Sequence, residues 1–154
     1  MLGMDGAGKT SFLHYMDILE PKAFSIHGPD TAKWENLKII SWDLGGGEKY
    51  QQFMRSSYYH NTNGILFVVD SQDRAYMEIV KAEFIKLLCE DEFKGVPILV
   101  LANKQDLKDV MSIDEIAKML ELNTIEGRKW CIHGCSATKK SGTIEALQWI
   151  QSQL

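Results

Sequence analysis

The residues most able to do chemistry form one stretch near the start of the chain, Gly3-Met4-Asp5-Gly6-Ala7-Gly8-Lys9-Thr10. It matches in full the pattern G-x-x-x-x-G-K-[S/T], whose glycines let successive backbone N–H groups curl round a phosphate chain. Lys9 would place a positive charge on the β- and γ-phosphates, and Thr10 would give its hydroxyl oxygen to Mg²⁺. Taken alone, the pattern could also be a glycine-rich turn with a chance lysine.

A second polar stretch, Asp43-Leu44-Gly45-Gly46, follows a strand predicted at residues 37–42. The Asp43 carboxylate can hold the hydration shell of Mg²⁺, and the Gly46 N–H can meet a γ-phosphate. An Asp-x-x-Gly pattern by itself is more often only a turn.

Two more polar stretches suit a purine base. Asn103-Lys104-Gln105-Asp106 follows a predicted strand at 96–102, and Cys135-Ser136-Ala137-Thr138 follows one at 130–133. The Asp106 carboxylate can accept both N1–H and N2–H of guanine, a pairing that adenine cannot offer, while the Lys104 stem can lie along a base face. The small Ala137 lets a backbone N–H approach the guanine O6. Asn-Lys-Gln-Asp alone could be a polar helix cap, but all the stretches in this order predict a guanine-nucleotide site.

The elements that must position these residues alternate along the chain. Apolar spacing predicts helices at 11–19, 74–89, 112–120 and 143–153, and strands at 37–42, 64–70, 96–102 and 130–133. Residues 21–35 are interpreted as a loop or short edge strand, and 51–59 as a short irregular helix. This order predicts a single α/β domain over 1–154, with a mainly parallel sheet, helices on both faces and ligands at the carboxyl ends of the strands.

The first strand is expected to be largely missing, because only Met1 and Leu2 precede Gly3. Either the chain is truncated at its start or it folds with a depleted sheet.

Composition narrows the class of protein. Hydrophobic residues make up 45% and charged residues 25% of 154 residues, which is ordinary for a soluble domain, and the net charge of −4 argues against nucleic-acid binding. We expect no membrane span, signal peptide or lipid anchor in these residues, a monomer, and a cytoplasmic location. The three cysteines suit a reducing compartment, and Cys131-x-His133-x-Cys135 is interpreted as buried thiols rather than a metal site.

Four stretches together resemble the Arf and Arf-like branch of the small GTPases, over nearly the whole chain. They are Gly3 to Thr10, Trp42-Asp43-Leu44-Gly45-Gly46, Phe67-Val68-Val69-Asp70-Ser71-x-Asp73-Arg74, and Ala102-Asn103-Lys104-Gln105-Asp106-Leu107. The resemblance implies the P-loop small G-protein fold, GTP or GDP with Mg²⁺, and effector, exchange-factor and GTPase-activating partners at two switch loops. It implies these nucleotide-binding residues: Asp5, Gly6, Ala7, Gly8, Lys9, Thr10, Ser11, Gly46, Asn103, Lys104, Asp106, Ser136, Ala137 and Thr138.

Two departures from the family bear on mechanism. Gly47 stands where the family has the glutamine that orients the attacking water. Hydrolysis should therefore be slow without a partner. The catalytic positions that the resemblance implies are Lys9, Gly46 and Gly47. Ungapped alignment puts Phe24 at the Mg²⁺-binding switch threonine, and a one-residue shift brings Ser25 there. The expected metal set is Thr10, Ser25 and Asp43.

Two further departures concern shape and surface. The stretch from Asp43 to Tyr58 is one residue longer than in the family, and the family's lipid-modified N-terminal helix is absent from these residues. By resemblance, Trp42 with Tyr58 or Tyr59 would form part of the aromatic patch through which the family binds effectors. Packing of these residues in the core is an equally good interpretation.

The functional prediction is an Arf-like GTP/GDP switch with slow or partner-dependent hydrolysis, acting in intracellular trafficking. The alternative is an interaction module that binds guanine nucleotide without hydrolysing it. A P-loop nucleotide kinase is disfavoured, because Asn103-Lys104-Gln105-Asp106 would have no role there.

Overall fold

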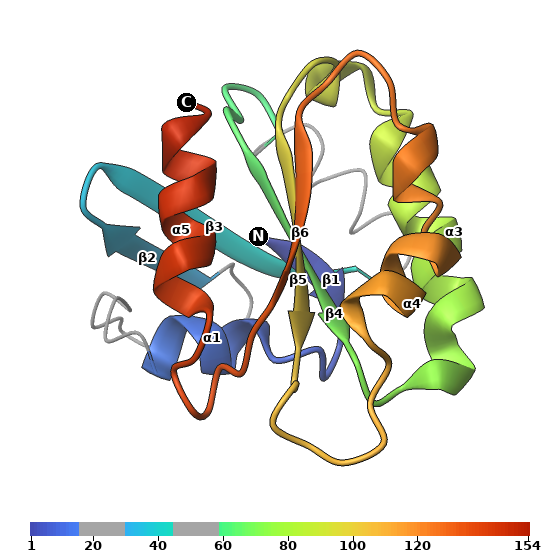
Figure 1. Cartoon of the computed structure of the whole chain (residues 1–154). Helices are drawn as coiled ribbons and strands as arrows, with labels where there is room; N and C mark the ends of the chain where they lie inside the picture. Colours follow the sequence, from blue (N-terminus) through green and yellow to red (C-terminus); the bar gives the residue numbers. More distant parts are fainter. Residues whose placement is uncertain (16–29, 45–58) are drawn as a thin grey trace.

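The computed structural model describes residues 1–15, 30–44 and 59–154 (Figure 1). The predictions made on Phe24, Ser25, Gly46, Gly47 and the helix at 51–59 therefore lie outside the described residues.

Within the described residues, six strands form one sheet in the order β2-β3-β1-β4-β5-β6. Every neighbouring pair is parallel except β2 with β3. This confirms the predicted α/β class with a mainly parallel sheet. The strands are β1 (Leu2–Met4), β2 (Asp30–Trp34), β3 (Leu37–Leu44), β4 (Ile65–Asp70), β5 (Ile98–Asn103) and β6 (Trp130–Gly134).

Helices cover both faces of this sheet, with α1 and α5 on one side and α3 and α4 on the other (Figure 1). The α-helices are α1 (Lys9–Tyr15), α3 (Met77–Leu88), α4 (Ile113–Met119) and α5 (Thr143–Ser152). Short 3₁₀ turns are η1 (Arg74–Tyr76), η2 (Asp91–Phe93) and η3 (Leu122–Thr124). The capping box that predicted α4 is formed, because Glu115 N donates to Ser112 Oγ at 3.2 Å and Ser112 N to Glu115 Oε2 at 2.8 Å.

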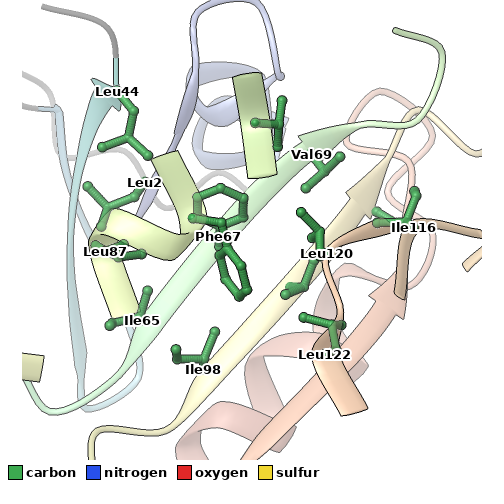
Figure 2. Close-up of a cluster of buried hydrophobic side chains, with 14 of the residues drawn as sticks. Leu2, Leu44, Ile65, Phe67, Val69, Leu87, Ile98, Ile116, Leu120 and Leu122 are labelled. Atoms are coloured by element: carbon green, nitrogen blue, oxygen red, sulfur yellow. The ribbon is translucent and has the colours of Figure 1, made fainter. Parts of the chain in front are cut away.

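The neighbouring interior strands β4 and β5 are apolar along almost their whole length because both of their faces are covered. Phe67 of β4 packs on Phe84 of α3, with ring centroids 4.8 Å apart. This side chain belongs to the cluster beneath α3 and α4 (Figure 2). On the opposite face, Phe12 of α1 and Leu147 of α5 belong to a second cluster. The core therefore fixes β4 and β5 firmly, and the loops that leave their carboxyl ends start from rigid positions.

The first strand does form, although it is only three residues long. Leu2 lies opposite both Trp42 of β3 and Phe67 of β4, so β1 takes a central place in the sheet. Gly3 is required there, because a Cβ at this position would lie 2.5 Å from the Val68 carbonyl oxygen. The expectation that most of this strand is missing agrees with its length, and the strand nevertheless delivers the glycine-rich loop to the carboxyl edge of the sheet.

Candidate functional site

The glycine-rich loop leaves β1 and turns directly into α1. Gly6 and Gly8 have φ angles of +74° and +96°, which favour glycine. Ala7 N donates to Met4 O at 3.2 Å, and Phe12 N donates to Gly8 O at 2.8 Å as the helix begins. The loop backbone thus has left-handed conformations at Gly6 and Gly8, which is the freedom that the glycines of the sequence pattern were expected to supply.

Lys9 lies inside this loop. Its side chain is buried, with 4% of the residue exposed, and Nζ donates to the carbonyl oxygens of Gly3 at 2.8 Å and Met4 at 2.7 Å. Because a buried ammonium requires polar partners, these contacts keep its positive charge beneath the loop. A phosphate bound by the loop N–H groups would meet that charge.

Asn103 joins the glycine-rich loop to the stretch after β6. Its Nδ2 donates to Ala7 O at 2.9 Å, and its Oδ1 accepts from Ala137 N at 3.0 Å. The residue is 2% exposed, and a Cβ on Gly8 would lie 2.2 Å from Nδ2. The side chain therefore holds two parts of the site together rather than pointing at a base, which refines the role that the resemblance implied.

Asp106 is exposed at the same edge of the sheet, and Ser136 orients it. Ser136 Oγ donates to Asp106 Oδ1 at 2.6 Å, and Ser136 Oγ and Thr138 Oγ1 lie 3.3 Å apart. The hydrogen bond from Ser136 holds the pKa of Asp106 below its ordinary value. An ionised carboxylate in a fixed orientation is the acceptor that the two guanine N–H donors need.

Lys104 sits between these groups with a left-handed backbone, at a φ of +69°. Its Nζ forms an ion pair with Asp70 Oδ2 at the end of β4. Gln105 adds a second link to the same strand end, because Nε2 donates to Ser71 Oγ at 2.8 Å and to Met111 O at 3.1 Å. The Asn-Lys-Gln-Asp stretch is thus tied to β4 as well as to β6.

A carboxylate that the sequence did not single out stands beside Thr10. Thr10 Oγ1 donates to Asp30 Oδ2 at 3.0 Å, and Asp30 begins β2. Asp43 is the Cα partner of Gly3 in the β1–β3 ladder, which places its backbone next to the start of the loop. Thr10 and Asp30 therefore place two oxygen-bearing side chains together beside the glycine-rich loop, and oxygen is the ligand atom that Mg²⁺ prefers.

Most of the remaining predictions can be located. Asp5 is exposed on the loop and Ser11 is half-buried in the first turn of α1. Cys135 is buried, and burial raises the pKa of its thiol to about 12. Cys131 is half-buried, and no group of three possible metal ligands occurs in the part of the chain that the structure describes.

The two described residues of the predicted effector patch, Trp42 and Tyr59, belong to the hydrophobic core. Trp42 and Tyr59 are stacked with centroids 6.1 Å apart, and Tyr59 contacts Phe93 with centroids 4.5 Å apart. Both Trp42 and Tyr59 are buried. Tyr58 lies outside the described residues.

The whole sequence is similar to known proteins. The family model described as "ADP-ribosylation factor family" matches residues 1–154. ADP-ribosylation factor K of Dictyostelium discoideum is 41% identical over 160 aligned residues, which cover 100% of this chain and 83% of that protein. ADP-ribosylation factor J of the same organism is 40% identical over 157 aligned residues, with the same coverage of both chains.

Proposed function

The chain belongs to the ADP-ribosylation factor family and therefore to the small GTP-binding switch proteins. We propose the following roles for its residues in nucleotide binding. Residues 1–154 act as one GTP-binding domain. Asp5 to Ser11 hold the phosphates through backbone N–H groups, the Lys9 ammonium and the start of α1. The observation that carries the proposal is the Asn103 side chain, which fixes the phosphate loop and the base-binding stretches as one unit.

Guanine would be selected by Asp106, with Lys104 along the base face and the Ala137 backbone beside O6. Ser136 and Thr138 keep the Asp106 carboxylate in place. Adenine presents no pair of adjacent N–H donors to such an acceptor, so guanine nucleotides bind in preference.

For Mg²⁺ we propose Thr10 as a direct ligand, with Asp43 and Asp30 around the hydrated ion. Asp30 accepts the Thr10 hydroxyl proton, which leaves the oxygen lone pairs available to a cation. Ser25 remains a proposed ligand. Asp30→Asn should weaken the Mg²⁺ dependence of GDP binding while leaving Mg²⁺-free binding unchanged. Equal Mg²⁺ dependence in both proteins would remove Asp30 from this role.

Hydrolysis is proposed to be slow. Gly46 N–H and Lys9 would stabilise charge on the γ-phosphate, but Gly47 has no side chain with which to orient water. A partner at the switch loops would have to supply that group.

The test is the nucleotide content of the purified protein before and after incubation with GTP and Mg²⁺. The denatured protein is analysed by anion-exchange chromatography, and Gly47→Gln is the companion variant. Bound GTP that persists in the natural chain and turns into GDP faster in Gly47→Gln supports the proposal. Rapid conversion in the natural chain contradicts slow hydrolysis, and the absence of nucleotide from both proteins contradicts the proposed GTP-binding site.

We propose that the switch acts in intracellular trafficking, as a cytoplasmic monomer that binds effectors, an exchange factor and a GTPase-activating protein. Family membership supports nucleotide-dependent partners. Among the helices of residues 1–15, 30–44 and 59–154, none has the length and hydrophobicity to cross a bilayer. Pull-down of partners with GTP-loaded against GDP-loaded protein tests this role, since a switch must bind at least one partner in a single nucleotide state.

A further inference from the structure

Asp70 brings a negative charge to the edge of the sheet where the base-binding stretches lie. It is the last residue of β4 and lies opposite Asn103 in the β4–β5 ladder. Its Oδ2 pairs with the Lys104 ammonium, and its Oδ1 accepts from Gln72 N at 2.9 Å. The side chain is only 22% exposed, so both carboxylate oxygens are used mainly inside the protein.

The turn that carries this carboxylate is fixed to neighbouring segments. Ser71 N donates to Asn103 O at 3.0 Å, and Ser71 O accepts from Met111 N at 2.8 Å. Ser71 itself is fully buried. Because the turn has little freedom, the Asp70 carboxylate determines where the Lys104 ammonium lies.

The backbone of Lys104 is fixed as well. Lys104 O accepts from Leu107 N at 3.1 Å, and Gln105 N donates to Cys135 O at 3.1 Å. The flexible four-carbon stem of the lysine therefore runs between an anchored backbone and an anchored ammonium. A stem without the second anchor would sample many rotamers, and ordering it against a ligand would cost entropy.

We propose that Asp70 is a positioning residue for the nucleotide, which holds the Lys104 ammonium so that the stem already lies along the face of the base. An apolar stem can pack on the flat face of any purine, so Asp70 increases affinity without selecting the base. Selection of the base belongs to Asp106. This inference rests on the proposed guanine-nucleotide site, in which Lys104 lies along the base.

The test is the affinity of Asp70→Asn for GDP and for inosine diphosphate, measured by competition with a fluorescent nucleotide. The amide keeps the size of the side chain and an oxygen for Gln72 N, but it has no charge with which to hold the ammonium. Both affinities should fall about tenfold, so their ratio should change by less than about twofold. Asp73→Asn is the matched control, because Asp73 is exposed and its side chain does not cap η1, and it should bind as the natural chain does.

A double-mutant cycle with Lys104→Met separates positioning of the lysine from a general structural role. Methionine keeps an unbranched stem but has no ammonium for Asp70 to hold. Lys104→Met alone should also lower GDP affinity about tenfold, and Asp70→Asn added to it should cause less than about a twofold further loss. A general structural role of Asp70 would give the same loss in both backgrounds.

Equal GDP affinity in Asp70→Asn and the natural chain would overturn the inference and leave the proposed guanine site intact. Equal losses from Asp70→Asn with and without Lys104→Met would also overturn it, as would a changed preference between GDP and inosine diphosphate. If Asp70→Asn does not fold, Lys104→Met decides, and natural GDP affinity in that variant overturns the inference. Absence of GDP binding by the natural chain would overturn both the inference and the proposed function.

Discussion

Replacing Asn103 by alanine should loosen the link between the phosphate loop and the base-binding stretches. The change removes the donor to Ala7 O and the acceptor of Ala137 N, at a residue that is only 2% exposed. A buried backbone group left without its partner costs about 1–3 kcal/mol. Water can reach part of the loop, so we expect the free energy of unfolding to fall by about 2–4 kcal/mol in total.

Urea denaturation of the nucleotide-free protein measures this loss directly. With a slope of about 2 kcal/mol per molar urea, the midpoint should fall by about 1–2 M. Asn123→Ala, which removes the same side chain at an exposed position of η3, is the matched control and should change stability by less than about 0.5 kcal/mol. GDP affinity should fall only in Asn103→Ala. A loss below about 1 kcal/mol with unchanged GDP affinity would refute the bridging role.

Two other changes probe the same site. Gly8→Ala should lower GDP affinity at least about tenfold in a fluorescent-nucleotide titration. The φ angle at this position is +96°, and the new Cβ would lie 2.2 Å from Asn103 Nδ2. An unchanged affinity would contradict the close approach of the loop to Asn103. Ser136→Ala removes the hydrogen bond that lowers the Asp106 pKa. GDP binding needs the ionised Asp106 carboxylate and is lost as pH falls through its pKa. The pKa should be higher in the variant, so the acid limit of GDP binding should move to higher pH. Identical pH profiles in the two proteins would contradict the orientation of Asp106 by Ser136.

Local patterns in the sequence were sufficient for much of the fold. The apolar runs of β4 and β5 are buried as predicted, and the capping box at Ser112 does begin α4. These features depend on short-range periodicity and side-chain chemistry, so they are visible without knowledge of the partners. The edge strand β2 could not be distinguished from a loop, because Asp-Thr-Ala-Lys-Trp shows no clear alternation and pairing with β3 decides its conformation.

The site was predicted as a set of residues but not as a set of contacts. Asp30 contacts Thr10, and Asp70 contacts Lys104, only because the fold brings separate segments to the same edge of the sheet. No motif spacing encodes such pairs. The bridging contacts of Asn103 were missed for the same reason, since the partners lie 96 and 34 residues away in the sequence.

The most direct test of guanine recognition is the base preference of Asp106→Asn, measured as the affinities for GDP and for xanthosine diphosphate. Xanthine has a carbonyl where guanine has its amino group, and an asparagine amide can donate to it while a carboxylate cannot. The natural chain should prefer GDP and the variant should prefer the xanthine nucleotide, with a change in the ratio of at least about a hundredfold, which equals about 2.7 kcal/mol. The same preference for GDP in both proteins would contradict the assignment of Asp106 to the base.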